Sequence, residues 1–549
     1  MESLCLEIDT KACCTRSDRV VAAMDVHPWI VLCGLSLFYF AIVLVQSALK
    51  LMWLDELISL YIAKLGSSRA IWSALEQAAD PNPPLYHWLS MWTMRVVGQN
   101  AFGLRLPAIL AGWASMAGVY LFLWRRVPVI FATIGTCSFM AMGGFDYAYE
   151  GRPYTLLLCF SIMSLLLWRS TVESDRGTLP AIGLALVLAA GISSNYFGGL
   201  AVFPIVIGEC VRTFRQRRVL WRVCLALFAG TASIFAYLPL IHSAMTRFVP
   251  HAWNKAYMSN VPSAYFEMVD CVLAPALLLL ATMVAAQTAH WWSSHVPQSR
   301  NIAARPVPEA GTLPLHETAA IVTLGFYPLL GYGIASMASG MISAKCVVPV
   351  CLAFAVLIAI ATFRLCANRG RLSICLLAFV LVWISTRQCV LGVWLVQQRR
   401  AFFALRDQLP ALSDSEKVLV PDCFLVLPLY YYGSQDLKGR IEFPIDFAAI
   451  HRYKGEDSGE QNLWAGRNRI FPVPVRQFTS LKEGDYPYLI VAPRANWFLN
   501  ELRDYGHSPK LLRFAPQGNQ MGDFTPLSRP NPAYFTIHLS NIMTGRAPR

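Results

Sequence analysis

Long apolar stretches alternate with short polar segments along most of this chain. Residues 28–50 run for about 23 positions without an acidic residue, enough to cross a hydrocarbon core of roughly 30 Å. The pattern recurs and predicts about eleven membrane-spanning helices. They are expected at residues 28–50, 104–124, 127–144, 154–169, 179–195, 197–211, 220–243, 269–290, 318–339, 343–366 and 373–396.

Arginines gather in every second polar segment between these spans. The arginines concerned are Arg125, Arg126, Arg169, Arg176, Arg212, Arg215, Arg217, Arg218, Arg222, Arg300, Arg305, Arg364, Arg369 and Arg371. Because basic residues concentrate in cytoplasmic loops, the N-terminal tail (residues 1–27) is expected to be cytoplasmic. The loops at 51–103, 145–153 and 244–268 and the tail at 397–549 then lie on the extracytoplasmic side. An odd number of spans agrees with this.

The tail at 397–549 has an ordinary soluble composition. It contains three strand-like runs, EKVLVPD, PYLIVAP and KLLRFAP, and a stretch with helical periodicity at Trp497–Tyr505. We therefore expect an α-helical polytopic membrane domain (residues 28–396) followed by a small α/β domain.

Composition agrees with a polytopic membrane protein. Of the 549 residues, 56% are hydrophobic and only 14% charged, against about 25% charged in soluble domains. The net charge of +13 is spread over short clusters between apolar spans, which indicates membrane topology rather than a nucleic-acid-binding face. No small-residue cleavage site follows the first span, so that span is expected to remain as an anchor.

The fifteen cysteines do not predict a disulfide framework. Most lie in or beside apolar spans, where cysteine behaves as a small apolar residue. Cys423 is the only one in the tail at 397–549, so no disulfide can close within it. For Cys5, Cys13 and Cys14 a reduced cytosolic tail is favoured over acylation or metal binding.

An acidic pair, Asp55-Glu56, follows the first span directly. Carboxylates that stay close to a bilayer tend to be functional or to sit at the water boundary. The pair therefore indicates acid–base or metal chemistry at the membrane surface, with the solvated face of an interfacial helix as the alternative.

A proline-rich corner follows in the same loop, in the run Asp80-Pro81-Asn82-Pro83-Pro84-Leu85-Tyr86-His87-Trp88. Its prolines fix the backbone and remove three amide donors. An interfacial helix is expected at Leu85–Val97. A simple turn between two surface helices would explain the prolines but not the acidic residues.

The next outer loop carries Glu150, Arg152 and Tyr154 between two spans. The planar fork of Arg152 can bind a phosphate bidentately, and Glu150 could hold that arginine, a metal or a substrate hydroxyl. Glu150 and Arg152 could also simply pair with each other. Lys345, at the outer start of a later span, either reaches the lipid headgroups or faces a lipid phosphate.

Other chemistries lack support in the sequence. It contains no GxxxxGK[ST], GxGxxG, HExxH or GxSxG motif, and its histidines show no metal-ligand spacing. Nucleotide-driven transport and serine hydrolysis are therefore unsupported.

Three ordered stretches resemble a known family. WLDELISLY, ADPNPPLYHWLSMWTMRVVGQNAFGLRLPAILAG and YAYEGRPYTLLL are similar to segments of the GT-C membrane glycosyltransferases, of the protein O-mannosyltransferase and aminoarabinose-transferase type. The resemblance covers roughly residues 50–170. It is closest to bacterial polyprenyl-phosphate-sugar-dependent members of the family 39 type, and the Pro-Pro-Leu-Tyr and Gly-Leu-Arg-Leu-Pro runs are its most specific elements.

The resemblance implies an inner (plasma) membrane enzyme that transfers a sugar, with inversion, from a polyprenyl-phosphate donor to a glycan, lipid or protein hydroxyl at the outer face. Asp55 would be the catalytic base. Glu56 would be its partner in acceptor or metal binding, and Arg152 and Lys345 would stabilise the leaving phosphate. Glu150 matches the acidic residue of the family's second loop.

Asp80, Tyr86, His87 and Tyr154 are also expected to bind substrate, without individual roles. The acidic loops permit a divalent cation at Asp55, Glu56 and Glu150, but the sequence does not require one.

The chain departs from the family at Lys345-Cys346, where many relatives have Arg-Tyr, so the phosphate-binding assignment of Lys345 is open. A flippase or transporter of lipid-linked sugars is the alternative function. Transporters usually show internal repeats and polar groups at the bilayer midplane. This chain shows no repeat, and its acidic residues gather at one interface.

Overall fold

The computed structural model describes residues 16–174, 177–270, 272, 313–366, 370–409, 417–481, 488–493, 496–507, 509–514 and 532–537. Helices dominate up to Gln408. They are α1 (Arg16–Val26), α2 (Pro28–Leu49), α3 (Leu54–Ala63), α4 (Ser68–Glu76), α5 (Leu85–Val97), α6 (Ala101–Trp124), α7 (Val129–Ala141), α8 (Tyr154–Glu173), α9 (Thr178–Ser194), α10 (Val202–Gln216), α11 (Trp221–Ala232), α12 (Leu238–Ser243), α14 (Leu315–Gly325), α15 (Tyr327–Met337), α16 (Val350–Cys366) and α17 (Gly370–Gln408).

Short helical turns connect these helices. They are η1 (Gly143–Tyr149), η2 (Tyr196–Ala201), η3 (Ser233–Tyr237), η4 (Ala244–Phe248), η5 (Val249–His251), η6 (Met258–Asn260), η7 (Ala344–Val347) and, in the tail, η9 (Phe478–Ser480).

The apolar pattern along the sequence located the helices of the bundle. Within the described residues, six helices are long and apolar enough to cross a membrane, or up to eight if two bent pairs each form one span. These helices and the shorter α9 and α16 coincide with the predicted spans. The span predicted at 269–290 falls mostly outside the described residues, so the total of eleven stays a prediction.

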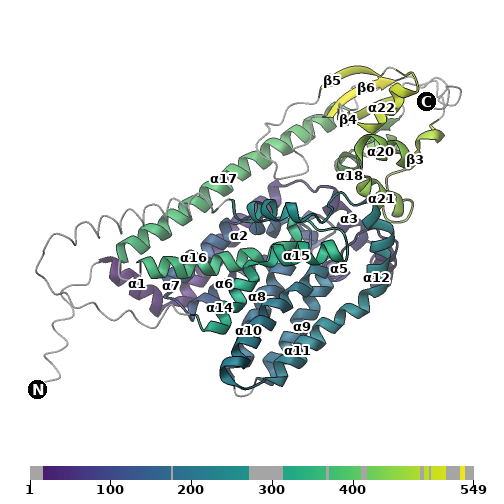
Figure 1. Cartoon of the computed structure of the whole chain (residues 1–549). Coiled ribbons are helices and arrows are strands. Elements are labelled where there is room, and N and C mark those ends of the chain that lie inside the picture. The colour runs from purple at the N-terminus through teal and green to yellow at the C-terminus, as the bar shows by residue number, and fades with distance from the viewer. Residues whose placement is uncertain are drawn as a thin grey trace, which may run out of the picture.

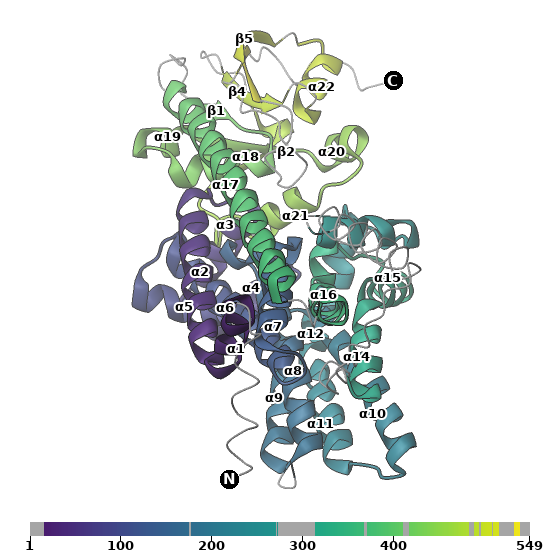
Figure 2. The same ribbon diagram turned by 90° about the vertical axis from the view of Figure 1, so that its left-hand side faces the viewer.

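Helix α17 extends beyond the span predicted at 373–396 and continues to Gln408. The continuation begins with Gln397, Gln398 and two arginines, which are good helix formers. Arg399 also donates a 2.7 Å hydrogen bond to the carbonyl of Ala48, which ties this part of α17 to the end of α2. Figure 2 shows α17 running along the bundle up to the C-terminal elements.

The C-terminal part contains a six-stranded sheet with helices around it. Its strands are β1 (Val418–Leu419), β2 (Ile441–Ile445), β3 (Val475–Gln477), β4 (Tyr488–Pro493), β5 (Lys510–Phe514) and β6 (Pro532–Ile537). Its helices are α18 (Cys423–Tyr432), α19 (Gln435–Arg440), α20 (Phe447–Lys454), α21 (Ser458–Ala465) and α22 (Trp497–Asp504). The strand order is β3-β2-β1-β4-β6-β5, parallel from β3 to β4 and antiparallel through β6 and β5. The predicted small α/β unit is thereby confirmed.

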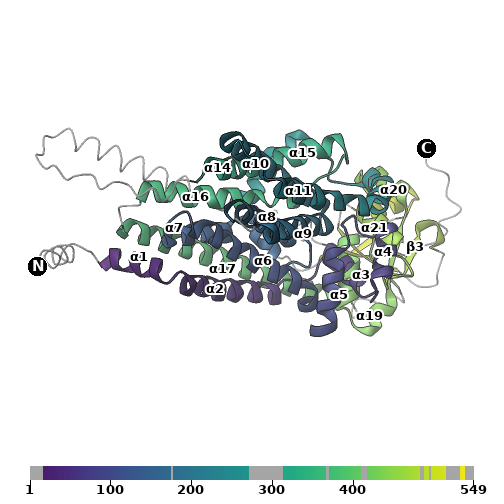
Figure 3. The same cartoon turned by 90° about the horizontal axis from the view of Figure 1, so that it is seen from below.

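One end of the helix bundle carries both α3 and the C-terminal elements. Figures 1 and 3 show α3, α4, α18 and α21 together at this end, whereas α1 lies at the opposite end. Loop segments far apart in the sequence therefore meet at one end of the bundle.

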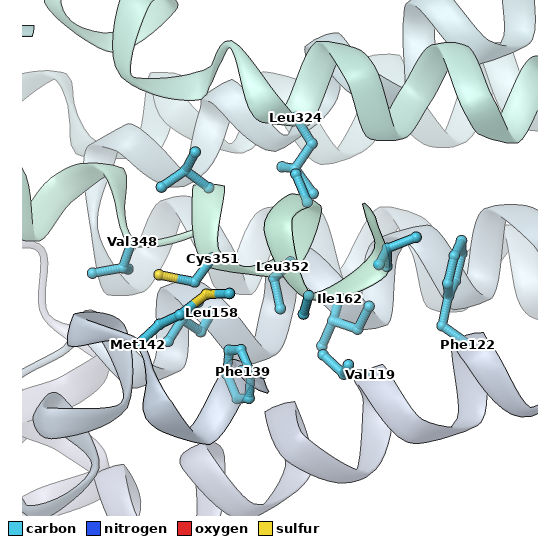
Figure 4. Packing of buried hydrophobic residues seen from close by; sticks show 14 of the residues in the cluster. Val119, Phe122, Phe139, Met142, Leu158, Ile162, Leu324, Val348, Cys351 and Leu352 are labelled. Carbon is cyan, nitrogen blue, oxygen red and sulfur yellow. The ribbon is translucent and has the colours of Figure 1, made fainter. Parts of the chain in front are cut away.

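Interlocked apolar side chains fill the centre of the bundle. Figure 4 shows Val119 of α6 beside Ile162 of α8, with Leu352 of α16 above them. Gly118 permits this approach, because a Cβ there would lie 2.9 Å from Ile162 Cγ2. Small residues allow helix backbones to come close to each other in membranes. Close packing matters there, because the hydrophobic effect does not drive helices together in lipid.

A second apolar cluster joins the outer loops to the C-terminal part. It includes Leu54 and Leu57 of α3 together with Val426 of α18 and Leu489 of β4. Burying a side chain of this size contributes roughly 1.5–3 kcal/mol. The C-terminal part therefore shares a core with the segment that carries Asp55.

The proline corner and α5 form as expected. Helix α5 spans Leu85–Val97, as predicted, and Pro84 precedes its first residue. Its end is set by Gly98, whose φ of 115° is unfavourable for residues with a Cβ. The corner thus fixes where Asp80 sits relative to α5.

Candidate functional site

A cavity of about 940 Å³ opens between the loops at 51–103 and 145–153 and the C-terminal part. Six of the nine residues predicted to form the site line it. They are Asp55, Asp80, Glu150, Arg152, Tyr154 and Lys345. Glu56, Tyr86 and His87 are not among its lining residues. The structure therefore brings together residues from three separate parts of the sequence.

Asp55 is placed by the first turn of α3. Helix α3 begins at Leu54, after the extended residue Trp53, so Asp55 lies at the positive end of the helix dipole. Its side chain is 29% exposed, and its Oδ2 atom lies 3.9 Å from Lys345 Nζ. The carboxylate is thus accessible from the cavity and lies close to the ammonium group of Lys345.

The surroundings of Asp55 make it a stronger base than a free aspartate. Removal from bulk water raises the pKa of Asp55. The positive charges of Arg152 and Lys345 oppose this, and the neighbouring carboxylates Asp80 and Glu150 add to it, so the net pKa is raised. A carboxylate with a raised pKa accepts a proton more readily.

Lys345 points into the cavity and is flanked by aromatic rings. Its Nζ lies 4.3 Å from the ring centroid of Trp53 and 5.9 Å from that of Tyr154. Cation–π contacts of this kind stabilise an ammonium group that is partly removed from water. The structure thus places Lys345 in the cavity that Asp55 also lines.

Arg152 is fixed by a short network rather than by Glu150. Its Nη1 atom donates to Asp80 Oδ2 at 2.6 Å, to Ser59 Oγ at 2.9 Å and to the carbonyl of Asp55 at 3.1 Å. Its buried Nε atom has no hydrogen-bond partner. Arg152 therefore braces α3 beside Asp55 and keeps one donor unused.

Both carboxylate oxygens of Asp80 accept hydrogen bonds. While Oδ2 accepts from Arg152, Oδ1 accepts from the backbone and side-chain nitrogens of Asn82 at 2.9 and 2.6 Å. Burial alone would raise the pKa of Asp80, but Arg152 more than offsets this and the pKa is lowered. Asp80 is therefore a permanent anion that orients Arg152.

Tyr86 and His87 lie behind the cavity wall. The Tyr86 hydroxyl donates to the carbonyl of Leu104 at 2.8 Å, which ties α5 to α6. His87 is buried 3.8 Å from Asp80 Oδ2, and burial lowers its pKa to about 4. His87 is therefore neutral near pH 7. The structure gives both residues supporting positions and no direct access to the cavity.

Glu150 pairs with Lys50, the residue that follows α2. Lys50 also lies over the ring of Tyr149, 5.5 Å from its centroid. One carboxylate oxygen of Glu150, Oε2, is buried without a hydrogen-bond partner. Glu150 thus retains one acceptor atom at the cavity wall.

Glu56 is fully buried and paired with Arg105. Its Oε1 accepts from Arg105 Nε at 2.7 Å and from the amide of Gly151 at 2.6 Å, and its Oε2 accepts from Arg105 Nη2 at 2.8 Å. Arg105 donates further to the carbonyls of Ser47 and Lys50. Burial alone would raise the pKa of Glu56, but Arg105 more than offsets this and the pKa is lowered.

Asp55, Glu56 and Glu150, where the sequence permits a divalent cation, do not form a metal-binding group in the structure. Within the described part of the chain, no group of three His, Cys, Asp or Glu side chains could hold a metal ion. The physical reason is that Glu56 faces Arg105 and Glu150 faces Lys50, so their charges are already neutralised.

Comparisons with known proteins agree with this architecture. A family model described as dolichyl-phosphate-mannose-protein mannosyltransferase matches residues 81–242. Crystal structures of ArnT from Cupriavidus metallidurans share the fold along nearly the whole chain. Residues 81–242 thus match a glycosyltransferase family model, and the chain as a whole shares the fold of the ArnT structures. The resemblance inferred from the motifs is thus confirmed.

The likeness to ArnT is one of fold. The structure bound to undecaprenyl phosphate is 12% identical, with a TM-score of 0.52, and the match covers 95% of this chain and 100% of that chain. The apo structure is 14% identical, with a TM-score of 0.52, and covers 92% and 98%. No curated protein matches this chain. The GT-C family segment includes Glu150 and Arg152 but ends before Lys345 and begins after Asp55.

Several residues of the site were missed by sequence reasoning. Lys50 and Arg105 are the main ones, and each carried a signal. Arg105 is a charged residue near the start of an apolar span, and such residues usually have a specific partner. Lys50 ends the first span directly before the acidic pair. Trp53 and Ser59 show no comparable signal, because their roles arise from side-chain packing alone.

Replacing Glu56 by Gln should destabilise the protein strongly. Arg105 would be left as an uncompensated buried charge, which costs about 3–5 kcal/mol in free energy of unfolding. The lowered pKa of Glu56 stabilises the fold above the ordinary carboxyl pKa, and this contribution is lost as the pH falls through the lowered value. Denaturant titration of the purified protein in detergent, at neutral and acidic pH, would measure both effects.

The matched control is the double variant Glu56→Leu with Arg105→Met, which removes both charges and should recover much of the loss. Wild-type stability of Glu56→Gln at neutral pH would contradict the structural role.

Proposed function

We propose that this protein is an inverting glycosyltransferase that moves a sugar from a polyprenyl-phosphate donor to an acceptor hydroxyl at the outer face of the membrane. The observation that carries the proposal is the cavity in which Asp55 lies 3.9 Å from Lys345, with Arg152 on the same wall. The match of residues 81–242 to a mannosyltransferase family model supports glycosyl transfer in general. The ArnT structure bound to undecaprenyl phosphate supports a lipid phosphate as the carrier of the sugar.

In this proposal Asp55 acts as the general base. The acceptor hydroxyl attacks the anomeric carbon and passes its proton to Asp55, while the bond from that carbon to the phosphate oxygen breaks. The polyprenyl phosphate leaves with the bonding electrons. One displacement without an enzyme nucleophile inverts the anomeric centre, and the raised pKa of Asp55 suits its role as a base.

Lys345 and Arg152 stabilise the leaving phosphate. Lys345 faces the cavity as a compact charge, and Arg152 keeps a free Nε donor there. Charges already in place where negative charge develops need no rearrangement during the reaction. Asp80 orients Arg152 in this scheme, and Glu150 offers its free Oε2 atom to a substrate hydroxyl.

Glu56 acts as a positioning residue in this scheme. Because its carboxylate also accepts from the Gly151 amide, it holds the second outer loop against the start of α3. Asp55 and Arg152 are thereby kept on the same wall of the cavity.

We also propose the orientation that the arginine pattern predicts. The N-terminal tail would then be cytoplasmic, and the loops of the cavity and the part after residue 396 would be extracytoplasmic. The structure supports this by placing α3 and the C-terminal elements at one end of the bundle.

Fusion of alkaline phosphatase after Arg549 should give an active reporter, because that enzyme requires an oxidising compartment to form its disulfides. Fusion after Arg125, in a predicted cytoplasmic loop, should give an inactive one. Active enzyme in the second fusion only would overturn the orientation.

Replacing Asp55 by Asn should abolish sugar transfer while leaving the fold intact. Loss of a general base lowers kcat by about 10²- to 10⁴-fold. Transfer would be measured in membranes by the release of polyprenyl phosphate from polyprenyl-phosphate sugars. Asp436→Asn, on exposed helix α19, is the matched control and should transfer normally. Normal transfer by a folded Asp55→Asn variant would disprove the role, and lipid-linked sugar movement without transfer would favour a flippase.

Replacing Lys345 by Gln should move the acid limb of the pH–rate profile to higher pH. Lys345 lowers the pKa of Asp55, so its removal raises that pKa and the base becomes protonated at a higher pH. Transfer at the optimum should also fall by about 10²- to 10³-fold, because the leaving phosphate loses one of the positive charges that stabilise it. Lys438→Gln, on α19, is the matched control. A reduced rate with an unchanged acid limb would contradict the coupling between Lys345 and Asp55.

A further inference from the structure

One wall of the cavity is built by the C-terminal part of the chain. Five residues from this part line it, namely Phe424, Glu456, Ser458, Gly459 and Asn462. Three of them belong to α21, and Glu456 lies two residues before it. None of the roles assigned to Asp55, Arg152 or Lys345 uses this wall.

Helix α21 comes close to the segment that carries Asp55. A Cβ at Gly459 would lie 3.5 Å from Leu54 Cδ2 and only 2.7 Å from Cys423 Sγ. Leu54 directly precedes Asp55. A group resting on the first turn of α21 would therefore lie near the Asp55 carboxylate. The loop at 244–268 also braces this turn, because His251 Nδ1 lies 2.7 Å from Asp457 Oδ1.

Asn462 carries an unused polar group on this wall. It is only 8% exposed, and its buried Oδ1 atom has no hydrogen-bond partner. A buried amide oxygen without a partner is unfavourable, because it has lost its hydrogen bonds to water. A hydroxyl group is a suitable partner, because it can both donate and accept and so fits the amide in either orientation.

The other polar groups on this wall are acceptors or neutral. The side chain of Glu456 is 23% exposed; its Oε1 pairs with Lys454 Nζ at 2.7 Å, and its Oε2 accepts from Ser458 Oγ at 3.1 Å. No lysine or arginine is among the described lining residues from the C-terminal part, whereas the opposite wall holds Lys50, Arg152 and Lys345. A phosphate would therefore be attracted to the opposite wall, because the wall of α21 offers it no lining cation.

We propose that α21 forms the acceptor subsite and that this subsite takes a neutral, polyhydroxylated group, that is, a glycan. Asn462 and Glu456 bind hydroxyls of the glycan, and the contact of Gly459 with Leu54 brings one further hydroxyl to Asp55. This rests on the proposed function, in which the donor phosphate occupies the wall of Lys345 and Arg152. The division of charge between the two walls then separates donor from acceptor.

Binding of simple probes to the full chain in nanodiscs tests the proposal. Saturation-transfer NMR titrations would compare two neutral trisaccharides, maltotriose and mannotriose, with glucose 1-phosphate. We expect at least one trisaccharide to bind on the wall of α21, whereas glucose 1-phosphate should bind on the opposite, cationic wall and be insensitive to changes on α21. The variants Asn462→Leu and Glu456→Gln should each lower the affinity for that trisaccharide about fivefold, which is the effect of losing one or two hydrogen bonds. Asn500→Leu, on α22 and outside the cavity lining, is the matched control and should bind as wild type.

Undecaprenyl phosphate binding is measured in the same samples and should be unchanged in all three variants. Failure of undecaprenyl phosphate to bind the wild-type protein would count against the proposed function and not against the glycan subsite. No binding of either trisaccharide, or wild-type affinity in both Asn462→Leu and Glu456→Gln, would overturn the subsite.

Discussion

The buried ion pair between Glu56 and Arg105 is the interaction on which the site depends. Arg105 reaches from α6 to the carbonyls at the end of α2, and Glu56 accepts from Arg105 and from the second outer loop at Gly151. Three helices and one loop therefore meet at a single charge pair. Buried charges are tolerated only when every hydrogen-bonding group is satisfied, so this junction has little freedom to shift.

The same constraint determines which acidic groups remain reactive. Glu150 is compensated by Lys50, Asp80 by Arg152 and Asp146 by Arg387. Asp55 differs because its nearest cation is 3.9 Å away and its side chain stays partly exposed. A partly desolvated carboxylate has a raised pKa when nearby cations compensate its negative charge only in part. A base that acts near neutral pH needs this property.

The C-terminal part completes the cavity instead of standing apart from it. It shares an apolar cluster with α3, and α21 faces the wall that carries the cations. Long-range packing thus places a hydrogen-bonding surface without a lining cation opposite a cationic one. This arrangement gives two chemically different surfaces on either side of one carboxylate.

The sequence by itself determined the fold class, the position of most helices and the separation of the chain into an apolar bundle and a tail with strands. These features follow from local patterns, such as the lengths of apolar runs and the proline corner before Leu85. It also singled out Asp55, Arg152 and Lys345, because charged residues beside a bilayer are rare and family motifs carry them.

Only the tertiary structure decided which of two adjacent acidic residues is accessible. Asp55 and Glu56 are equivalent in a one-dimensional pattern, but successive residues on a helix point about 100° apart. One therefore faces the cavity and the other faces Arg105. The partners Lys50 and Arg105, and the contact of α21 with Leu54, depend on residues far apart in the chain, which no local pattern encodes.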